Sequence, residues 1–120
     1  MSEDIFRGSY KNTAVWQKSF LLSQHVYRLT ESFPDSERFG LTSQMRRASI
    51  SIPSNIAEGY GRYSKKHLDQ FLRVAYGSAF ELETQIALAK TLPHTKHAAY
   101  DESEILLTEV IKLLYVMLYR

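Results

Sequence analysis

Residues 64–89 of the chain read SKKHLDQFLRVAYGSAFELETQIALA. Apolar side chains recur in this stretch at alternating spacings of four and three residues, which places them on one face of an α-helix. Ser64 can cap the start of such a helix, and Pro93 ends it. The stretch therefore predicts a long helix that packs against other helices through Leu68, Leu72, Ala75, Ala79, Leu82, Ile86 and Ala89.

Gly77 lies in the middle of that predicted helix. Glycine costs about 1 kcal/mol relative to alanine at such a site. Close approach of a neighbouring helix would explain why glycine stands at this position despite its cost. The sequence leaves open whether that helix belongs to the same chain or to a second copy.

Two earlier stretches follow the same rhythm. The first predicts a helix over residues 14–32, which Thr13 or Asn12 can cap. The second predicts a helix over residues 41–58 that contains Pro53. Because proline lacks a backbone N–H, we expect a kink or break just before it, near Ser49–Ile52. Gly59 and Gly61 then supply a turn that tolerates positive φ.

The last stretch begins at Asp101, which is expected to form a capping pair with Glu104 while Tyr100 packs against Ile105. It carries two apolar stripes, where a helix of a bundle needs one. The second stripe is expected to pack against another copy of the chain. The predicted oligomer interface is Leu107, Ile111, Leu114 and Leu118, with Leu106, Val110, Leu113 and Met117 as the alternative set.

Four helices joined by short links predict an all-α fold, an antiparallel up-down-up-down four-helix bundle. The 120 residues suffice for one domain with its own core. We expect residues 1–120 to form that domain, with residues 1–12 as a loosely ordered N-terminal segment.

The composition and motifs argue against several classes of function. The chain has no cysteine, no long apolar run and no apolar N-terminal stretch, so we expect a cytoplasmic protein without contact to a membrane. It has no Gly-x-Ser-x-Gly elbow, no phosphate-binding loop and no Glu-x-x-His pair. His94 and His97 lie in a link, where solvated histidines are common. We therefore expect no enzyme, no metal site and no cofactor.

Charge is distributed unevenly along the chain. Residues 7–73 carry eleven Lys or Arg against five Asp or Glu, whereas residues 74–120 carry four against six. A basic surface with interleaved aromatic rings, here Tyr60 and Tyr63, is typical of nucleic-acid binding. An ordinary solvated helix face is the alternative. The candidate nucleic-acid-binding residues are Arg46, Arg47, Arg62, Lys65, Lys66 and Arg73, which the antiparallel hairpin can separate into two groups.

A polar stripe runs beside the apolar seam of residues 41–58. Polar groups that are partly buried need hydrogen-bond partners. The stripe predicts an interhelical network that fixes helix register, with a ligand pocket as the alternative. Its predicted members are Gln44, Arg47, Asn55, Glu58 and, from the next helix, Glu81.

The segment GLTSQMRRASISIPSNIAEG at residues 40–59 resembles the signature of the four-helix-bundle proteins encoded in 23S rRNA intervening sequences. VWQK at 15–18, AYGS at 75–78 and ELET at 81–84 agree with it. The resemblance implies a ring-like homopentamer. A similar fold serves as the accessory variability determinant of diversity-generating retroelements, where it binds a reverse transcriptase and nucleic acid through a basic surface.

Two functions are consistent with the sequence. The first is a non-enzymatic oligomeric protein that binds nucleic acid, RNA or an RNA–protein complex above all, through its basic surface. The alternative is a protein-interaction scaffold that binds an acidic protein or a reverse-transcriptase-like partner.

Overall fold

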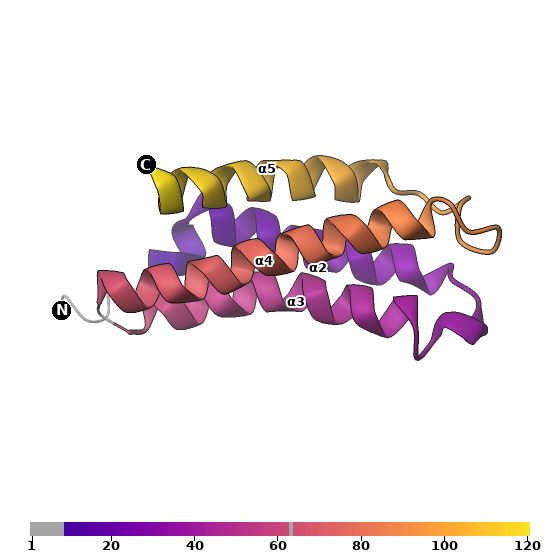
Figure 1. Ribbon diagram of the computed structural model, residues 1–120, viewed down its shortest axis with the longest axis horizontal. Coiled ribbons are helices and arrows are strands. Elements are labelled where there is room, and N and C mark those ends of the chain that lie inside the picture. Colours follow the sequence, from indigo (N-terminus) through magenta and orange to yellow (C-terminus); the bar gives the residue numbers. More distant parts are fainter. Residues whose placement is uncertain (1–8, 63) are drawn as a thin grey trace.

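Four long helices make up the protein in a computed structural model that describes residues 9–62 and 64–120. Figure 1 shows successive helices running in opposite directions, so the predicted all-α four-helix bundle is confirmed. Of the predicted N-terminal segment, residues 9–12 form a short 3₁₀ helix and residues 1–8 lie outside the described part. The elements are η1 (Ser9–Asn12), α2 (Ala14–Glu31), η2 (Asp35–Glu37), α3 (Leu41–Tyr60), α4 (Lys65–Ala89) and α5 (Asp101–Tyr119).

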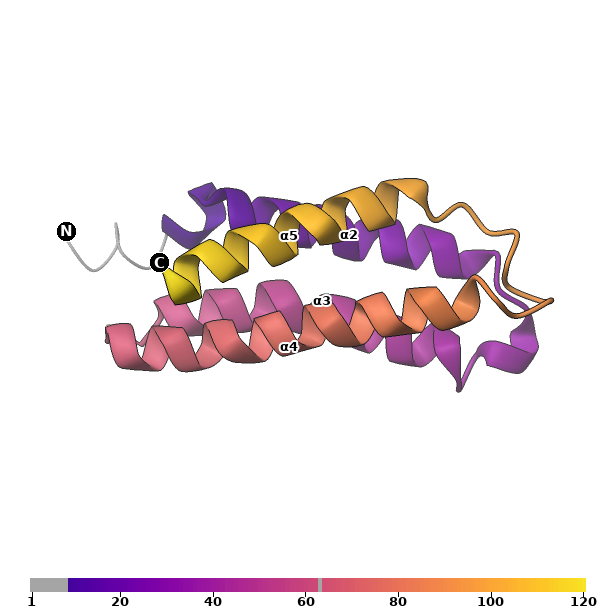
Figure 2. The same ribbon diagram turned by 45° about the horizontal axis from the view of Figure 1, so that its top comes forward.

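Each helix packs against two neighbours. α2 and α4 both contact α3 and α5, so the four helices enclose one core. Figure 2 shows α2 beside α5 and α3 beside α4. The bundle therefore has four faces, named here by their helix pairs: the α2/α3 face lies opposite the α4/α5 face, and the α3/α4 face lies opposite the α2/α5 face. Within the described residues, no helix is long and apolar enough to cross a membrane.

The seam predicted from residues 64–89 forms the buried side of α4. Leu72, Ala75, Ala79, Leu82, Ile86 and Ala89 are each at most 2% exposed. Thr13 and Ser64 are the N-caps of α2 and α4, because their side chains accept hydrogen bonds from the N–H groups of Trp16 (3.2 Å) and His67 (3.4 Å). Both predicted caps are confirmed.

The start of α5 differs from the prediction. Asp101 is the first helical residue, and no side chain caps the helix. Tyr100 is buried, and its hydroxyl donates to the carbonyl of Thr95 at 2.7 Å, whereas Ile105 is 61% exposed. The predicted pairing of Tyr100 with Ile105 is wrong, because the link from α4 holds the tyrosine ring inside the core.

α3 is one continuous helix from Leu41 to Tyr60, although Pro53 lies within it. Proline cannot donate to the carbonyl four residues earlier, so the Ser49 carbonyl loses its partner within the helix. Ser23 of α2 supplies the replacement: its hydroxyl donates to Ser49 O at 2.9 Å. The predicted break is therefore wrong, because a neighbouring helix satisfies the one acceptor that the proline leaves free.

α3 also runs past its predicted end at Glu58. Gly59 lies inside the helix, and a Cβ there would come within 3.0 Å of the side chains of Leu68 and Phe71. Gly61 caps the helix with φ of −78°, so the turn requires no positive φ. The glycine at position 59 is explained by the close approach of α4 to α3.

The predicted oligomer stripe on α5 needs correction. Leu107 and Leu114 are 3% and 0% exposed within one chain, and Val110 of the other stripe is also fully buried. Ile111 and Leu118 are only half-buried, against the same core. The two stripes are one residue apart and form a single wide apolar face, because residues of both stripes are buried in the core of the same chain.

Glu37 ties together the two links at one end of the bundle. Its Oε1 accepts a hydrogen bond from the backbone N–H of Leu41 (3.0 Å) in the first turn of α3, and its Oε2 lies 2.7 Å from His94 Nε2 in the α4–α5 link. The hydrogen bond with His94 and, second, that from Leu41 lower the pKa of Glu37 below its ordinary value. The carboxylate thus stabilises both links only while it is ionised.

This arrangement predicts a pH-dependent contribution to stability. Because the folded chain lowers the pKa of Glu37, the contribution is present above the ordinary pKa of 4.5 and is lost as the pH falls through the folded value. We expect Glu37→Ala to cost about 1 kcal/mol near neutral pH, the size of a helix-cap interaction, and less below the folded pKa. Urea unfolding across the acid range measures this. Glu31→Ala, at an exposed carboxylate, is the control, and an equal penalty for Glu37→Ala at every pH would contradict the prediction.

Candidate nucleic-acid interface

Cations gather at the end of the bundle where α3 turns into α4. Arg62 follows the cap of α3, Lys65 and Lys66 open α4, and Arg73 lies two turns further on. Figure 1 shows that α2 begins and α5 ends at the same end. Two exposed cations that were not predicted from the sequence, Lys11 and Arg120, therefore lie there as well. We call this set the basic end: Lys11, Arg62, Lys65, Lys66, Arg73 and Arg120.

The cations of the basic end differ in their contacts within the chain. Lys65 pairs with Asp69 at 3.0 Å, one helical turn away, and the guanidinium of Arg62 lies 5.1 Å from the centre of the Phe71 ring. Lys66 and Arg73 form no ion pair with any described residue. Exposed, unpaired cations of this kind bind phosphate groups without first giving up a protein partner.

Arg46 and Arg47 do not belong to the basic end. They lie 16 and 15 residues before Arg62, which is about 24 Å along α3. Arg46 is also held by α2: its Nε donates to Thr30 Oγ1 at 2.8 Å, and its guanidinium covers the Tyr27 ring at 4.5 Å. Arg46 is therefore a structural contact between helices, away from the basic end, and its assignment to a nucleic-acid surface stays a prediction.

The aromatic residues expected beside the cations are differently placed. Tyr60 is half-buried against the core, and burial raises the pKa of its hydroxyl. Its ring is thus not open for a base to stack on. Tyr63 lies outside the described residues. The strongly exposed rings near this end are Tyr115 and Tyr119 of α5, which are 54% and 56% exposed.

The predicted polar network is not formed within one chain. Its members Gln44, Arg47, Glu58 and Glu81 are exposed, and no hydrogen bond or ion pair between described residues joins them. Asn55 donates to Ser51 O at 2.7 Å, and Ser51 Oγ lies 2.8 Å from Ser78 Oγ of α4. The prediction is wrong for the single chain because the stripe lies at the solvent edge of the α3/α4 face, where Ser51 and Ser78 form a hydrogen bond between the helices.

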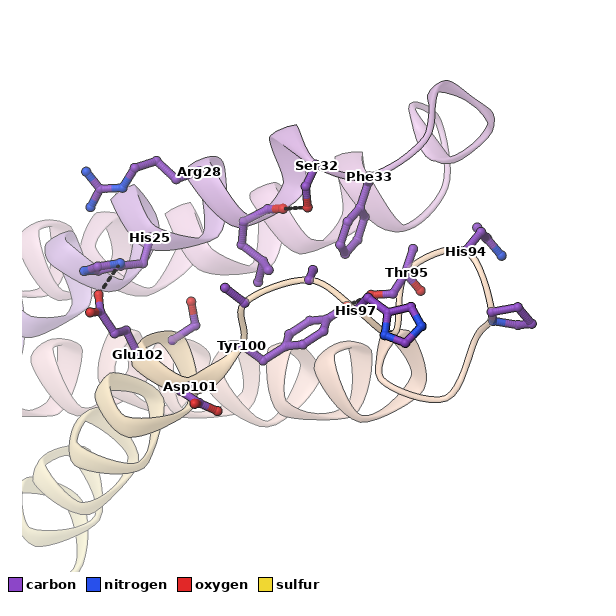
Figure 3. Close-up of a pocket in the computed structure, with 15 residues that line it drawn as sticks. His25, Arg28, Ser32, Phe33, His94, Thr95, His97, Tyr100, Asp101 and Glu102 are labelled. Carbon is purple, nitrogen blue, oxygen red and sulfur yellow. Dashed lines mark hydrogen bonds and ion pairs between the residues drawn. The ribbon is translucent and has the colours of Figure 1, made fainter.

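An open cavity of about 810 Å³ lies between the second half of α2 and the α4–α5 link. Figure 3 shows His25 and Glu102 facing each other there, with Nδ1 and Oε2 3.2 Å apart. His94 binds Glu37 and so does not converge with His97. Among residues 9–62 and 64–120, no group of three or more potential ligands is placed to hold a metal ion. The cavity lies at the end opposite the basic end, and Arg28 and Glu102 in its lining give it mixed charge.

These features define a class of protein: a small antiparallel four-helix bundle with unpaired cations at one end. The chain belongs to the 23S rRNA-intervening sequence protein family, whose model matches residues 11–116. The resemblance seen at residues 40–59 is thereby confirmed, and the match includes nearly all of the four long helices. A comparison with curated proteins found no match.

Proposed function

We propose that this protein is a non-enzymatic, oligomeric nucleic-acid-binding protein whose basic end contacts phosphate groups, with RNA as the principal ligand. The observation that carries the proposal is the basic end itself, where six exposed cations from η1, the α3–α4 turn, α4 and the C-terminal residue lie at one end of the bundle beside Glu58 and Asp69. Contacts of Lys and Arg with phosphates release condensed counterions and supply affinity without sequence specificity. The family, named for rRNA intervening sequences, favours RNA over DNA.

Exposed apolar side chains on two opposite faces support assembly. On α4, Val74 and Leu88 are 51% and 50% exposed and lie in one row with Gly77, along the α3/α4 face. On the α2/α5 face, Leu21 and Ile105 are 40% and 61% exposed. Two unlike surfaces on opposite sides associate head to tail, and such contacts close into a ring when the rotation between subunits permits it.

A ring of copies also explains how a basic end with only six cations could bind nucleic acid with high affinity. Each copy brings its own cations, and after the first contact the others bind at a high effective concentration. The homopentamer that the family resemblance implies is the assembly we propose. In a proposed ring whose axis is parallel to the helices, the basic ends of all copies would lie on one rim.

A substitution at Gly77 tests this assembly. No atom lies within 4 Å of the position that a Cβ would occupy there, so no described residue of the same chain explains the glycine. We expect Gly77→Trp to lower the mass of the oligomer by blocking a closely packed neighbour, as measured by light scattering. Lys96→Trp, in the link at the opposite end, is the control and should leave the mass unchanged. A monomer at micromolar concentration for the unaltered chain would contradict the proposed assembly.

Fluorescence anisotropy tests the function. The probes are short single- and double-stranded RNA and DNA, titrated at several salt concentrations. We expect binding at about 50 mM salt that weakens steeply as salt rises, since each phosphate contact adds to the salt dependence. Absence of binding to all four probes at low salt would refute the proposal and favour a scaffold that binds an acidic protein.

A further inference from the structure

Four aromatic rings form a cluster on the α4/α5 face. Tyr76 and Phe80 of α4 meet edge to face at 4.9 Å between ring centres, and Tyr119 of α5 lies 6.1 Å from Tyr76. Tyr115 extends the cluster, 5.2 Å from Tyr119. Phe80, Tyr115 and Tyr119 are 41%, 54% and 56% exposed, so much of their ring surface faces solvent.

Two unpaired cations of the basic end continue directly into this cluster. Lys66, Arg73, Tyr76 and Phe80 follow one another on α4 at spacings of seven, three and four residues. Such spacings place all four on one strip of the helix. The strip from Lys66 to Phe80 is about 21 Å long, at 1.5 Å per residue.

We propose that Phe80, Tyr115 and Tyr119 form a stacking platform for the unpaired bases of a single nucleic-acid strand, while Lys66 and Arg73 hold its phosphates. The inference rests on the proposed function and specifies its ligand. A positively charged track beside aromatic rings is the combination that single-strand binding proteins use, because every base has a π-face. A duplex keeps its base faces covered by stacking, so it could use the cations but not the rings.

The aromatic cluster also lies on a different face of the bundle from the two faces proposed for assembly. Those faces, α3/α4 and α2/α5, lie on opposite sides of the bundle, and the α4/α5 face lies between them. Tyr115 and Glu104 share one row of α5, and Glu104 pairs with Lys90 of α4 at 3.0 Å, which places Tyr115 on the α4 side of the helix. A ring built through the two assembly faces leaves the cluster open to a ligand.

The test is the double variant Tyr115→Ala/Tyr119→Ala, compared with Tyr115→Phe/Tyr119→Phe. In anisotropy titrations at one salt concentration, the alanine variant should bind single-stranded RNA at least about tenfold more weakly, while its affinity for double-stranded RNA stays unchanged. The phenylalanine variant should retain single-strand affinity, because stacking needs the ring and not the hydroxyl. Phe39→Ala is the control, since Phe39 is 85% exposed in the link before α3, at the other end of the bundle.

Three results would overturn the platform. One is unchanged single-strand affinity of the alanine variant, and another is equal loss on single and double strands. The third is a smaller oligomer for the alanine variant by light scattering, which would assign the cluster to a subunit contact. Failure of the unaltered protein to bind any nucleic acid would instead refute the proposed function.

Discussion

Changing Arg62, Lys65 and Lys66 together to glutamate should abolish binding to RNA. Each reversal removes an attractive contact with a phosphate and adds a repulsive one at the same place. The neutral variant with three glutamines should retain weak binding, and the slope of log affinity against log salt should fall by about two units for each copy that contacts a single strand, at roughly 0.7 per lost contact. Anisotropy measures both effects, while circular dichroism and light scattering check helicity and oligomer size.

The matched control reverses Arg28, Arg38 and Lys96, three exposed cations at the other end of the bundle. The change in net charge is the same, so any difference between the two triple variants reports position rather than total charge. We expect the control to bind RNA almost as well as the unaltered protein. Equal loss in both would show that the whole molecule's charge attracts RNA and that the basic end is not a site.

Leu114→Ala should destabilise the protein by about 3 kcal/mol. Leu114 is fully buried at the centre of the core-facing side of α5, and truncating such a leucine loses its transfer free energy and leaves a cavity. Urea unfolding followed by circular dichroism measures the loss. Thr108→Ala, at an exposed site on the same helix, should change stability by less than about 0.5 kcal/mol.

Leu114 also distinguishes two roles for the apolar stripes of α5. A core leucine lowers the stability of the single chain, whereas an interface leucine lowers the mass of the oligomer. A Leu114→Ala protein that unfolds like the unaltered chain but forms smaller species would contradict the placement seen in the structure. Ile105 is exposed on the α2/α5 face, so Ile105→Ala should lower the mass of the oligomer instead of the stability of the single chain.

The sequence was sufficient to predict the helices and most of the core. The four-three rhythm of residues 64–89 matches the buried side of α4, and the side-chain caps at Thr13 and Ser64 mark two helix starts. The prediction from sequence failed where the role of a residue depends on how its helix packs against another helix. Leu107 and Leu114 of one α5 stripe and Val110 of the other are all buried in the same core, so spacing alone could not divide the stripes between the core and an interface.

The candidate site was predictable only in part. The cations around the α3–α4 turn are neighbours in sequence, so their grouping could be predicted. The contact of Arg46 with α2 could not be predicted, because its partners Tyr27 and Thr30 lie on another helix. Arg120 was missed because it is far from the other cations in sequence, although the predicted antiparallel course of α5 already returns the C-terminus to that end. The aromatic cluster joins α4 to α5: each helix carries one pair of rings four residues apart, but the meeting of Tyr76 with Tyr119 depends on how the two helices pack.

The contact of Ser23 with α3 has a consequence for how related sequences can change. Pro53 is tolerated in the middle of α3 because the hydroxyl of Ser23 satisfies the Ser49 carbonyl. The two positions should therefore covary among relatives that share the fold. Where proline stands at position 53, a serine or threonine should stand at position 23, and where another residue replaces the proline, position 23 should be free to lose its hydroxyl.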